Sequence, residues 1–274
     1  MKKSSILSNL SGIPVLVSRT GTAFLILITP LLISSPQAQA QVSLSGSGYS
    51  QDFNSIGSGL PEGWSVWEGA SEVDVGSVSS LNTTPTAWSS SSSGFKNYAS
   101  SDGLSLDSSS AEQSGSLNRA LGVRSTGSFG DPGAGFMFSV ADTLGLGNFG
   151  LSFDALILDE ENRSTEWTLD YRVGDSGFVA LDTFTLDSFG SQTFSYDLGN
   201  AVDNLGASLD FRIGSFSNSI GTGSRDTFAI DNFQVSFTPV PEPEEYMLVS
   251  GLILAVFAVF RKRKSAPCAV SQEG

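Results

Sequence analysis

Carboxylates are the side chains of this sequence with the spacing to do chemistry, and they occur in two sets. Glu72 and Asp74 alternate, so that a strand would place both on one face. Asp159–Glu161 is an acidic run followed by Asn162 and Glu166. Two facing carboxylates about 5 to 10 Å apart could hydrolyse a glycosidic bond. Several carboxylate and amide oxygens in one loop could bind calcium, although such a run is more typical of a solvated turn.

Two motif matches are incomplete. Glu72-Val73-Asp74 resembles the start of the E-x-D-x-x-E pattern of jelly-roll glucanases, but Ser77 stands where the third acid belongs. Glycoside hydrolysis is therefore the least favoured function. Gly145–Gly150 matches G-x-G-x-x-G, which binds a dinucleotide only when a helix follows. An alternating apolar run follows instead, so this segment predicts a hairpin loop.

Composition excludes several classes of function. The 274 residues contain no histidine and one cysteine, Cys268, so there is no Ser-His-Asp machinery, no imidazole metal site and no internal disulfide. Residues 41–240 hold seven basic residues against 24 acidic ones, a net charge of −17. Nucleic acid is excluded as a partner, because phosphate contacts need clustered Lys and Arg. Such a charge keeps a protein soluble, and anionic polymers would approach it only through divalent cations.

The middle of the chain predicts β-strands. In Trp167–Val173 every second residue is apolar, as in a strand with one buried face, and Gly174–Gly177 suits a tight hairpin turn. Comparable apolar runs are 135–140, 149–158, 166–173, 178–186, 191–198, 207–214 and 227–237. No amphipathic helix of useful length separates them. The fold class predicted is all-β, an antiparallel β-sandwich.

Residues 1–40 are typical of a secretory signal peptide. Basic residues precede an apolar run, Ala23–Ile33, and the small residues Ala38 and Ala40 suit signal peptidase, which predicts cleavage after Ala40. An N-terminal membrane anchor is the alternative. The apolar run is short for a span of about 30 Å and contains Pro30.

The C-terminal region has three parts in order. The sequence Pro241-Glu242-Pro243 is rigid and extended. It precedes a charge-free apolar run, Tyr246–Phe260, and a basic cluster made of Arg261, Lys262, Arg263 and Lys264. Basic residues after an apolar helix stay in the cytoplasm, so residues 41–240 are predicted outside the membrane. Fifteen residues reach only about 22 Å as a helix, which is short for a permanent anchor.

This ending resembles the PEP-CTERM sorting signal of bacterial surface proteins, over residues 240–264. The resemblance implies processing by an exosortase-type membrane enzyme that cuts near the Pro-Glu-Pro motif, with Pro241, Glu242 and Pro243 as the recognition element. It also implies that 246–260 is a transient membrane anchor and that the basic cluster is its cytoplasmic stop. The ten residues after Lys264 depart from the pattern, and a permanent single-pass anchor is the alternative.

The ectodomain resembles the jelly-roll modules of bacterial surface proteins and carbohydrate-binding domains. The matching motifs are Asp52-Phe53 followed by Pro61-Glu62-Gly63-Trp64 near its start and Ile230–Val235 near its end. In such modules the first and last strands are neighbours, which would bring Asp52 close to Asp231. The resemblance implies a calcium ion held there by carboxylates and backbone oxygens. The alternative is that Asp231 caps a turn and Asp52 faces water.

Residues 76–116 are rich in Ser and Gly and are predicted to form long loops. Trp88 and Tyr98 within them could stack on a sugar, or they could pin the loops to the core. A glycan site would need exposed aromatic rings, for which Trp64, Trp67, Trp88 and Tyr98 are the candidates. In a purely structural protein these rings would be buried.

The predicted organisation is a signal peptide at 1–40, one β-sandwich ectodomain at 41–238, a sorting signal at 239–264 with a transmembrane segment at 246–260, and a cytoplasmic tail at 265–274. The predicted function is that of a non-catalytic protein of the cell surface or extracellular matrix, exported and briefly membrane-associated. Its predicted partners are signal peptidase and the sorting enzyme. The alternative is a module that binds extracellular polysaccharide, with calcium as its one candidate cofactor.

Overall fold

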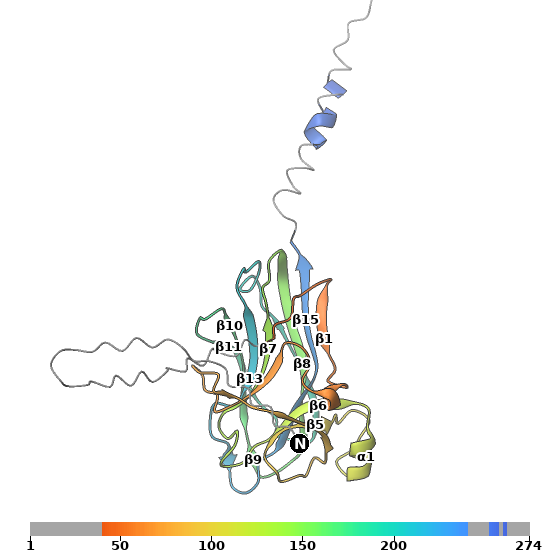
Figure 1. The fold of residues 1–274 in the computed structure, drawn as a ribbon, viewed down its shortest axis with the longest axis vertical. Coiled ribbons are helices and arrows are strands. Elements are labelled where there is room, and N and C mark those ends of the chain that lie inside the picture. Colours follow the sequence, from red (N-terminus) through yellow and green to blue (C-terminus); the bar gives the residue numbers. More distant parts are fainter. Residues whose placement is uncertain (1–39, 241–251, 258–259, 262–274) are drawn as a thin grey trace, which may run out of the picture. The chain divides into compact units, whose positions relative to one another are not determined.

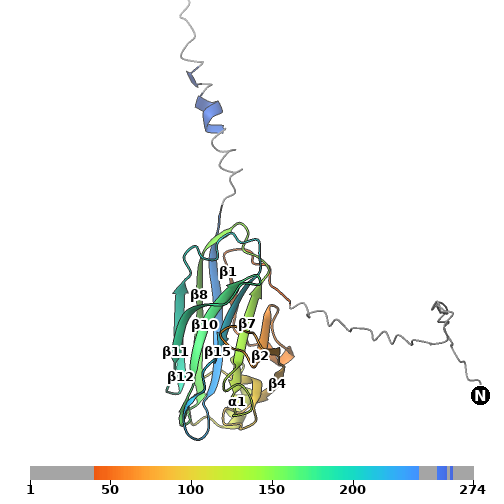
Figure 2. The ribbon, with the colours of Figure 1, turned by 90° about the vertical axis from the view of Figure 1, so that its left-hand side faces the viewer.

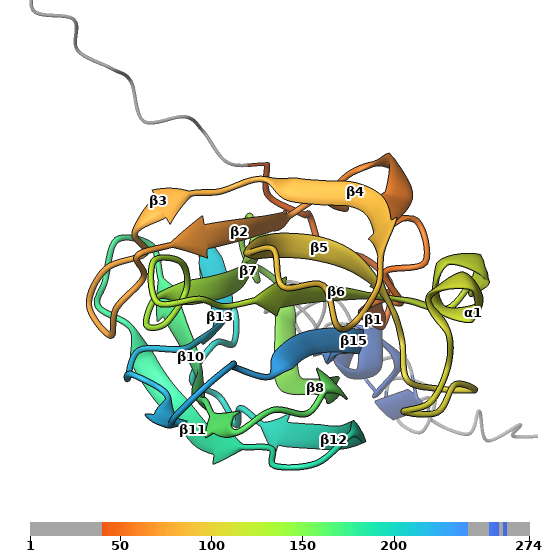
Figure 3. The same cartoon turned by 90° about the horizontal axis from the view of Figure 1, so that it is seen from below.

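Two β-sheets face each other in the part of the chain that the structure, a computed structural model, describes: residues 40–240, 252–257 and 260–261. Figure 1 shows the strands running along the long axis of this sandwich, and Figure 3 shows the sheets as two layers. The predicted β-sandwich is confirmed. Its strands follow the alternation in the sequence: in β10 (Glu166–Val173), Trp167 and Leu169 are buried against the opposite sheet.

The first sheet has seven strands. Its order is β12 (Gly190–Asp197), β8 (Leu146–Asp159), β15 (Thr227–Pro239), β6 (Arg119–Arg124), β5 (Gly94–Ala99) and β4 (Leu81–Thr86), and β1 (Gly48–Gln51) also pairs with β15. The resemblance to jelly-roll modules implied that the first and last strands are neighbours, and the antiparallel pairing of β1 with β15 confirms it.

The second sheet has six strands. Its order is β11 (Val179–Thr185), β10, β13 (Leu209–Gly214), β7 (Ala134–Val140), β2 (Trp64–Glu68) and β3 (Ser77–Val78). The short strands β9 (Arg163–Ser164) and β14 (Ile220–Gly221) pair separately. Figure 2 shows the edge strands β11 and β12 along one flank, where the Tyr196 hydroxyl donates to Asp182 over 2.9 Å and joins the two sheets.

Aromatic rings fill the space between the sheets. Trp167 stacks on Phe228 with their centroids 3.8 Å apart, and Trp64 meets the rings of Phe53 and Phe233 edge-on at 4.8 Å. Each large aromatic side chain removes more apolar area from water on burial than a smaller residue does. The single cysteine, Cys268, lies outside the sandwich, so the sandwich folds on this hydrophobic core without a disulfide.

The segment 76–116 differs from the predicted long loops. It contains β3, β4, β5 and a short helix, α1 (Ser110–Gly115), which begins with a capping box formed by Ser109 and Glu112. The β4–β5 pair is parallel, whereas the sequence predicted antiparallel strands. Apolar and polar residues do not alternate regularly in β5, because both of its faces are covered. Phe95 lies in the main core, and Tyr98 lies in a second cluster on the outer face of the sheet.

That second cluster is where two of the aromatic residues of the serine-rich segment lie. Trp88 and Tyr98 are buried there with Leu156, Leu158 and small residues of β6 and β15. The Trp88 indole donates to the backbone oxygen of Ala99 over 2.9 Å. These contacts pin the segment to the sheet, which was one of the two alternatives from the sequence.

The predicted terminal elements lie mostly outside the described residues. This applies to the signal peptide, to Ala38, to Pro241, Glu242 and Pro243, to most of the segment 246–260, to Lys262, Arg263 and Lys264, and to the tail at 265–274. Residues 252–257 are helical. No helix within the described part of the chain has the length and apolar character to cross a bilayer.

Candidate functional site

The candidate site lies where β15 changes partners on one side. Gln51 of β1 pairs with Phe233, and Leu121 of β6 pairs with Ile230, so β1 and β6 follow one another along the same edge of β15. Asp231 and Asn232 lie between the two pairings, at an irregularity in the register with β8. A junction of this kind leaves backbone and side-chain oxygens without a neighbouring strand.

Backbone geometry marks the same place. Phe53 and Asn232 have φ values of +53° and +48°, two of the four non-glycine positive values among the described residues. The left-handed conformation is unfavourable for a side chain as large as that of Phe53, and such residues are enriched at functional sites. The loop after β1 is held by Asn54, whose side-chain oxygen accepts from the Arg119 backbone N–H over 2.8 Å.

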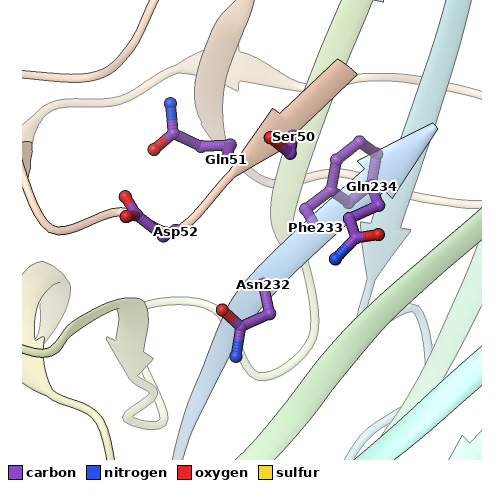
Figure 4. Close-up of a pocket in the computed structure, with 6 residues that line it drawn as sticks. All are labelled: Ser50, Gln51, Asp52, Asn232, Phe233 and Gln234. Atoms are coloured by element: carbon purple, nitrogen blue, oxygen red, sulfur yellow. The ribbon is translucent and has the colours of Figure 1, made fainter. Parts of the chain in front are cut away.

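A polar pocket of about 420 Å³ opens at this junction. We call it the β1–β15 groove; Figure 4 shows its lining residues, which are Ser50, Gln51, Asp52, Asn232, Phe233 and Gln234. Ser50 and Gln234 lie opposite each other on paired strands and are both exposed. The groove therefore offers hydroxyl, amide and carboxylate groups, while its one aromatic ring, that of Phe233, is buried in the core.

A second pocket of about 210 Å³ continues from the first, and Gln234 lines both. The second pocket adds Ser152, Ser195 and Ser236 from β8, β12 and β15. Together the pockets form a band of hydrogen-bonding groups across several strands, which suits a ligand rich in hydroxyl groups.

Asp231 is a buried carboxylate beside the groove. It is 1% exposed, its Oδ1 accepts from the Asn232 backbone N–H over 2.8 Å, and its Oδ2 has no hydrogen-bond partner. Burial, with smaller contributions from the negative charges of Asp154 and Asp52, raises the pKa of Asp231 to about 7. Hydrogen bonds from the Ser100 side chain and the Asn232 backbone oppose this rise. A buried carboxylate oxygen without a partner costs free energy, and protonation of the carboxyl or a bound group would reduce that cost.

The residues predicted to hold calcium lie close together. Asp52 is near enough for its charge to act on Asp231, and its own oxygens accept from the backbone and side chain of Asn54. No group of three or more Asp, Glu, His or Cys residues that could hold a metal occurs within the described residues. An ion here would rely on Asp231, Asp52 and neutral oxygens such as the amide of Asn232. The unpartnered Oδ2 fits a hard cation of this kind.

The predicted stacking residues are not available to a sugar. Trp64, Trp88 and Tyr98 are 6%, 2% and 0% exposed, because Trp64 lies in the main core and the other two lie in the second cluster. Trp67 is half-buried and its indole donates to Ser65 over 2.8 Å. Three of the four candidate rings are therefore closed to a sugar, and for Trp88 and Tyr98 the alternative of pinning to the core is the one that the structure shows.

The two acidic sets from the sequence also have structural partners. Glu72 and Asp74 lie in a loop rather than on a strand, and Asp74 Oδ1 accepts from the Gly76 backbone N–H over 3.0 Å. Asp159 and Glu161 both form ion pairs with Arg124, at 2.7 and 3.2 Å. Carboxylates neutralised by an arginine are poor candidates for a calcium loop.

Sequence reasoning found Asp52 and Asp231 but missed the rest of the groove. Ser50 and Gln234 are ordinary exposed residues of strands, and nothing in their spacing distinguishes them. The signal that was present is the sequence Asp231-Asn232, which interrupts the alternation of the last strand and marks a bulge.

Comparisons with known proteins give the following. No family model and no curated protein matches the chain. Among solved structures it is similar to the CBM22-2 xylan-binding domain of a Paenibacillus barcinonensis protein, with TM-score 0.38, 12% identity and coverage of 69% of this chain and 99% of that one. It is also similar to the xylan-binding module CBM15, with TM-score 0.39, 10% identity and coverage of 72% and 100%.

A third similar structure is the K1 cleaved adhesin domain of Lys-gingipain from Porphyromonas gingivalis. Its TM-score is 0.40 and its identity 15%, with coverage of 70% of this chain and 98% of that one. Values this low transfer neither a ligand nor an activity to this chain.

Proposed function

We propose that this chain is an exported, non-catalytic surface protein whose jelly-roll-like sandwich binds a neutral polysaccharide in the β1–β15 groove. The groove itself is the observation that carries the proposal, because it joins exposed hydroxyl and amide groups over about 420 Å³. A net charge of −17 on residues 41–240 favours a neutral glycan over an anionic one. Because the groove has no exposed aromatic platform, binding is expected to be weak.

Titration of soluble neutral polysaccharides (a xylan, a β-glucan and a mannan) into the full-length protein, followed by calorimetry, tests the proposal. Gln234→Ala is expected to weaken binding about tenfold, since Gln234 lines both pockets. Gln192→Ala, an exposed glutamine on β12 of the same sheet, is the matched control. If no polysaccharide binds, or if both variants bind as the wild type does, the groove is not the site.

Export and sorting form the second part of the proposal. They are supported by the signal-peptide pattern and by the order of Pro241–Pro243, the apolar run and the basic cluster. Intact mass of the protein recovered from its cells, beside a Pro241→Ala/Pro243→Ala variant, tests them. A mature chain that begins at Gln41 and ends near Pro243, and that is lost in the variant, is the expected result. An uncut C-terminus in both proteins would leave a membrane-anchored protein instead.

A calcium ion at the junction is a second proposal, favoured by the unpartnered Oδ2 of Asp231. The ion would be held by Asp231 and Asp52 and would neutralise their repulsion. Calcium at about 100 times its Kd should stabilise the fold by about 2.7 kcal/mol. Chemical denaturation with calcium and with chelator checks this, and Asp231→Asn should lose the effect. Asp175→Asn, in the exposed turn after β10, is the control. A wild-type protein that calcium leaves unchanged would contradict the proposal.

A further inference from the structure

Lys96 is a buried lysine on the outer face of the seven-stranded sheet. It is 2% exposed and lies on β5. The preceding residue, Phe95, faces the core. Its Nζ lies 2.7 Å from Ser92 Oγ and 3.5 Å from Ser90 Oγ, and it donates to the backbone oxygen of Ser92. The amine is therefore surrounded by the oxygens of two serines.

No carboxylate forms an ion pair with Lys96 among the described residues, whose acidic groups pair with arginines only. Burial lowers the pKa of Lys96, and the positive charge of Arg124 lowers it further. Arg124 itself is neutralised by Asp159 and Glu161. Both effects make it easier for the ammonium group to lose a proton, after which the amine can act as a base.

Ser92 connects this amine to the solvent. The residue is exposed, and its Oγ lies 3.0 Å from Ser90 Oγ as well as 2.7 Å from Lys96 Nζ. Lys96 Nζ donates to the Ser92 backbone oxygen, to Ser92 Oγ and to Ser90 Oγ. Once it has lost a proton, the amine can instead accept from the Ser92 hydroxyl at the same separation. A hydroxyl within hydrogen-bond reach of a neutral amine is an activated nucleophile with its general base.

We propose that Ser92 is a nucleophilic serine that accepts an acyl group from activated esters, with Lys96 as its general base. Ser92 Oγ attacks the ester carbonyl carbon, and its hydroxyl proton passes to Lys96 Nζ as the new C–O bond forms. The bond from that carbon to the leaving oxygen then breaks. The proton returns from Nζ, by way of the Ser90 hydroxyl, to the departing alkoxide, which leaves as the alcohol. The products are an acyl-serine and a neutral lysine.

The serine run supplies internal controls. Ser89–Ser93 are five consecutive serines, and the hydrogen bonds of Lys96 go to Ser90 and Ser92 alone among them. General chemical reactivity of an exposed serine would label Ser91 and Ser93 as readily as Ser92. Activation by Lys96 selects Ser92.

The test is to incubate the full-length protein with 4-nitrophenyl acetate and, separately, with an alkyl fluorophosphonate, and to locate adducts by peptide mass spectrometry. Labelling of Ser92 is expected to be on the order of 100-fold faster than that of Ser93, because general-base catalysis contributes about that much. Ser92→Ala should abolish the adduct, and Ser93→Ala should leave it unchanged. Equal labelling along the run would overturn the proposal.

Lys96→Met and Lys96→Arg test the base, since methionine has no proton acceptor and arginine keeps its charge. Both should slow labelling of Ser92 on the order of 100-fold; an unchanged rate overturns the proposal. If these variants do not fold, the wild-type pH profile decides. The Ser92 labelling rate should rise and level off with a midpoint below the ordinary lysine value of 10.5. A rate that climbs with hydroxide concentration without levelling off contradicts a lysine base.

Discussion

On the outer face of the six-stranded sheet, Arg212 is fully buried, yet it has a complete set of partners. Its guanidinium donates to both oxygens of Asp170, at 3.0 and 2.6 Å, and lies 3.5 and 4.4 Å from the ring centroids of Phe178 and Phe216. On the outer face of the seven-stranded sheet, Asp231 and Lys96 are almost as deeply buried, and neither is paired with an opposite charge.

The two sheets therefore differ in how the buried ionisable groups on their outer faces are satisfied. The bidentate pairing of Arg212 with Asp170 and the two aromatic rings beside it satisfy the buried charge of this arginine within the six-stranded sheet. The seven-stranded sheet holds the buried carboxyl of Asp231 and the buried amine of Lys96 without an opposite charge beside either among the described residues. Both the groove and the serine-lysine pair therefore lie on the same sheet.

Arg212→Met should have the largest effect on stability. It leaves Asp170 buried without its partner, which costs about 3–5 kcal/mol of unfolding free energy. The double variant Arg212→Met/Asp170→Leu should recover most of that loss, because no charge remains buried. Urea denaturation of the wild type and both variants measures the two values. A single variant within 1 kcal/mol of the wild type would show that the six-stranded sheet is not held by this pair.

Asp231→Asn should remove a dependence of stability on pH. The pKa of Asp231 is raised from 3.8 to about 7 in the folded protein, so the folded state holds a proton that the unfolded state has released. Stability therefore falls as pH rises between about 4 and 7, by no more than about 4 kcal/mol, and stays lower above that range. In chelator, the wild type should be less stable than Asp231→Asn at pH 8 and similar to it at pH 4.

The raised pKa of Asp226, about 6, acts in the same direction, and it is present in both proteins of that comparison. Subtracting the two stability profiles therefore isolates Asp231. A difference that does not change with pH would show that the Asp231 carboxylate is already compensated.

Lys96→Met should cost less than about 1 kcal/mol, in contrast to Arg212→Met, because it leaves no carboxylate unpaired. Urea denaturation measures this change as well. A loss of 3 kcal/mol or more would show that the serine oxygens around Lys96 hold an ammonium ion. The stability effects of Lys96→Met and Arg212→Met would then be alike.

Gln234→Ala should have the smallest effect on stability, within about 0.5 kcal/mol, since Gln234 is exposed. It should still weaken polysaccharide binding. If Gln234→Ala lost stability as well as binding, the weaker binding would reflect damage to the fold and not the loss of a ligand contact.

The sequence predicted strands from runs of apolar residues, including runs in which both faces are covered, as in β7 and β13. Trp167–Val173 alternates because its outer side is partly open, and it forms β10 within the predicted bounds. The strand β6 was missed because the small residues Ala120 and Gly122 alternate with Leu121 and Val123, so that its sequence shows no polar–apolar alternation. The second hydrophobic cluster, on the outside of the sheet, covers its second face.

Two residues of the candidate site were predicted from the sequence, and the others were not. Asp52 and Asp231 could be placed together because the first and last strands of such a sandwich are neighbours, which the structure confirms. The burial of Lys96 was not predictable, since its partners Ser90 and Ser92 belong to a run with the composition of a flexible loop. Contacts that depend on how a loop folds over a sheet leave no periodic signal in a sequence.

The position of β15 determines how the sandwich carries mechanical load. Any tension applied to the chain beyond Pro239 enters through β15, which pairs with β8 along nearly its whole length and with β1 and β6 on its other side. A pull along this strand loads its hydrogen bonds in shear, all together, instead of opening them one by one from an end. A domain held at a surface by its C-terminal side would resist flow through its most heavily bonded strand.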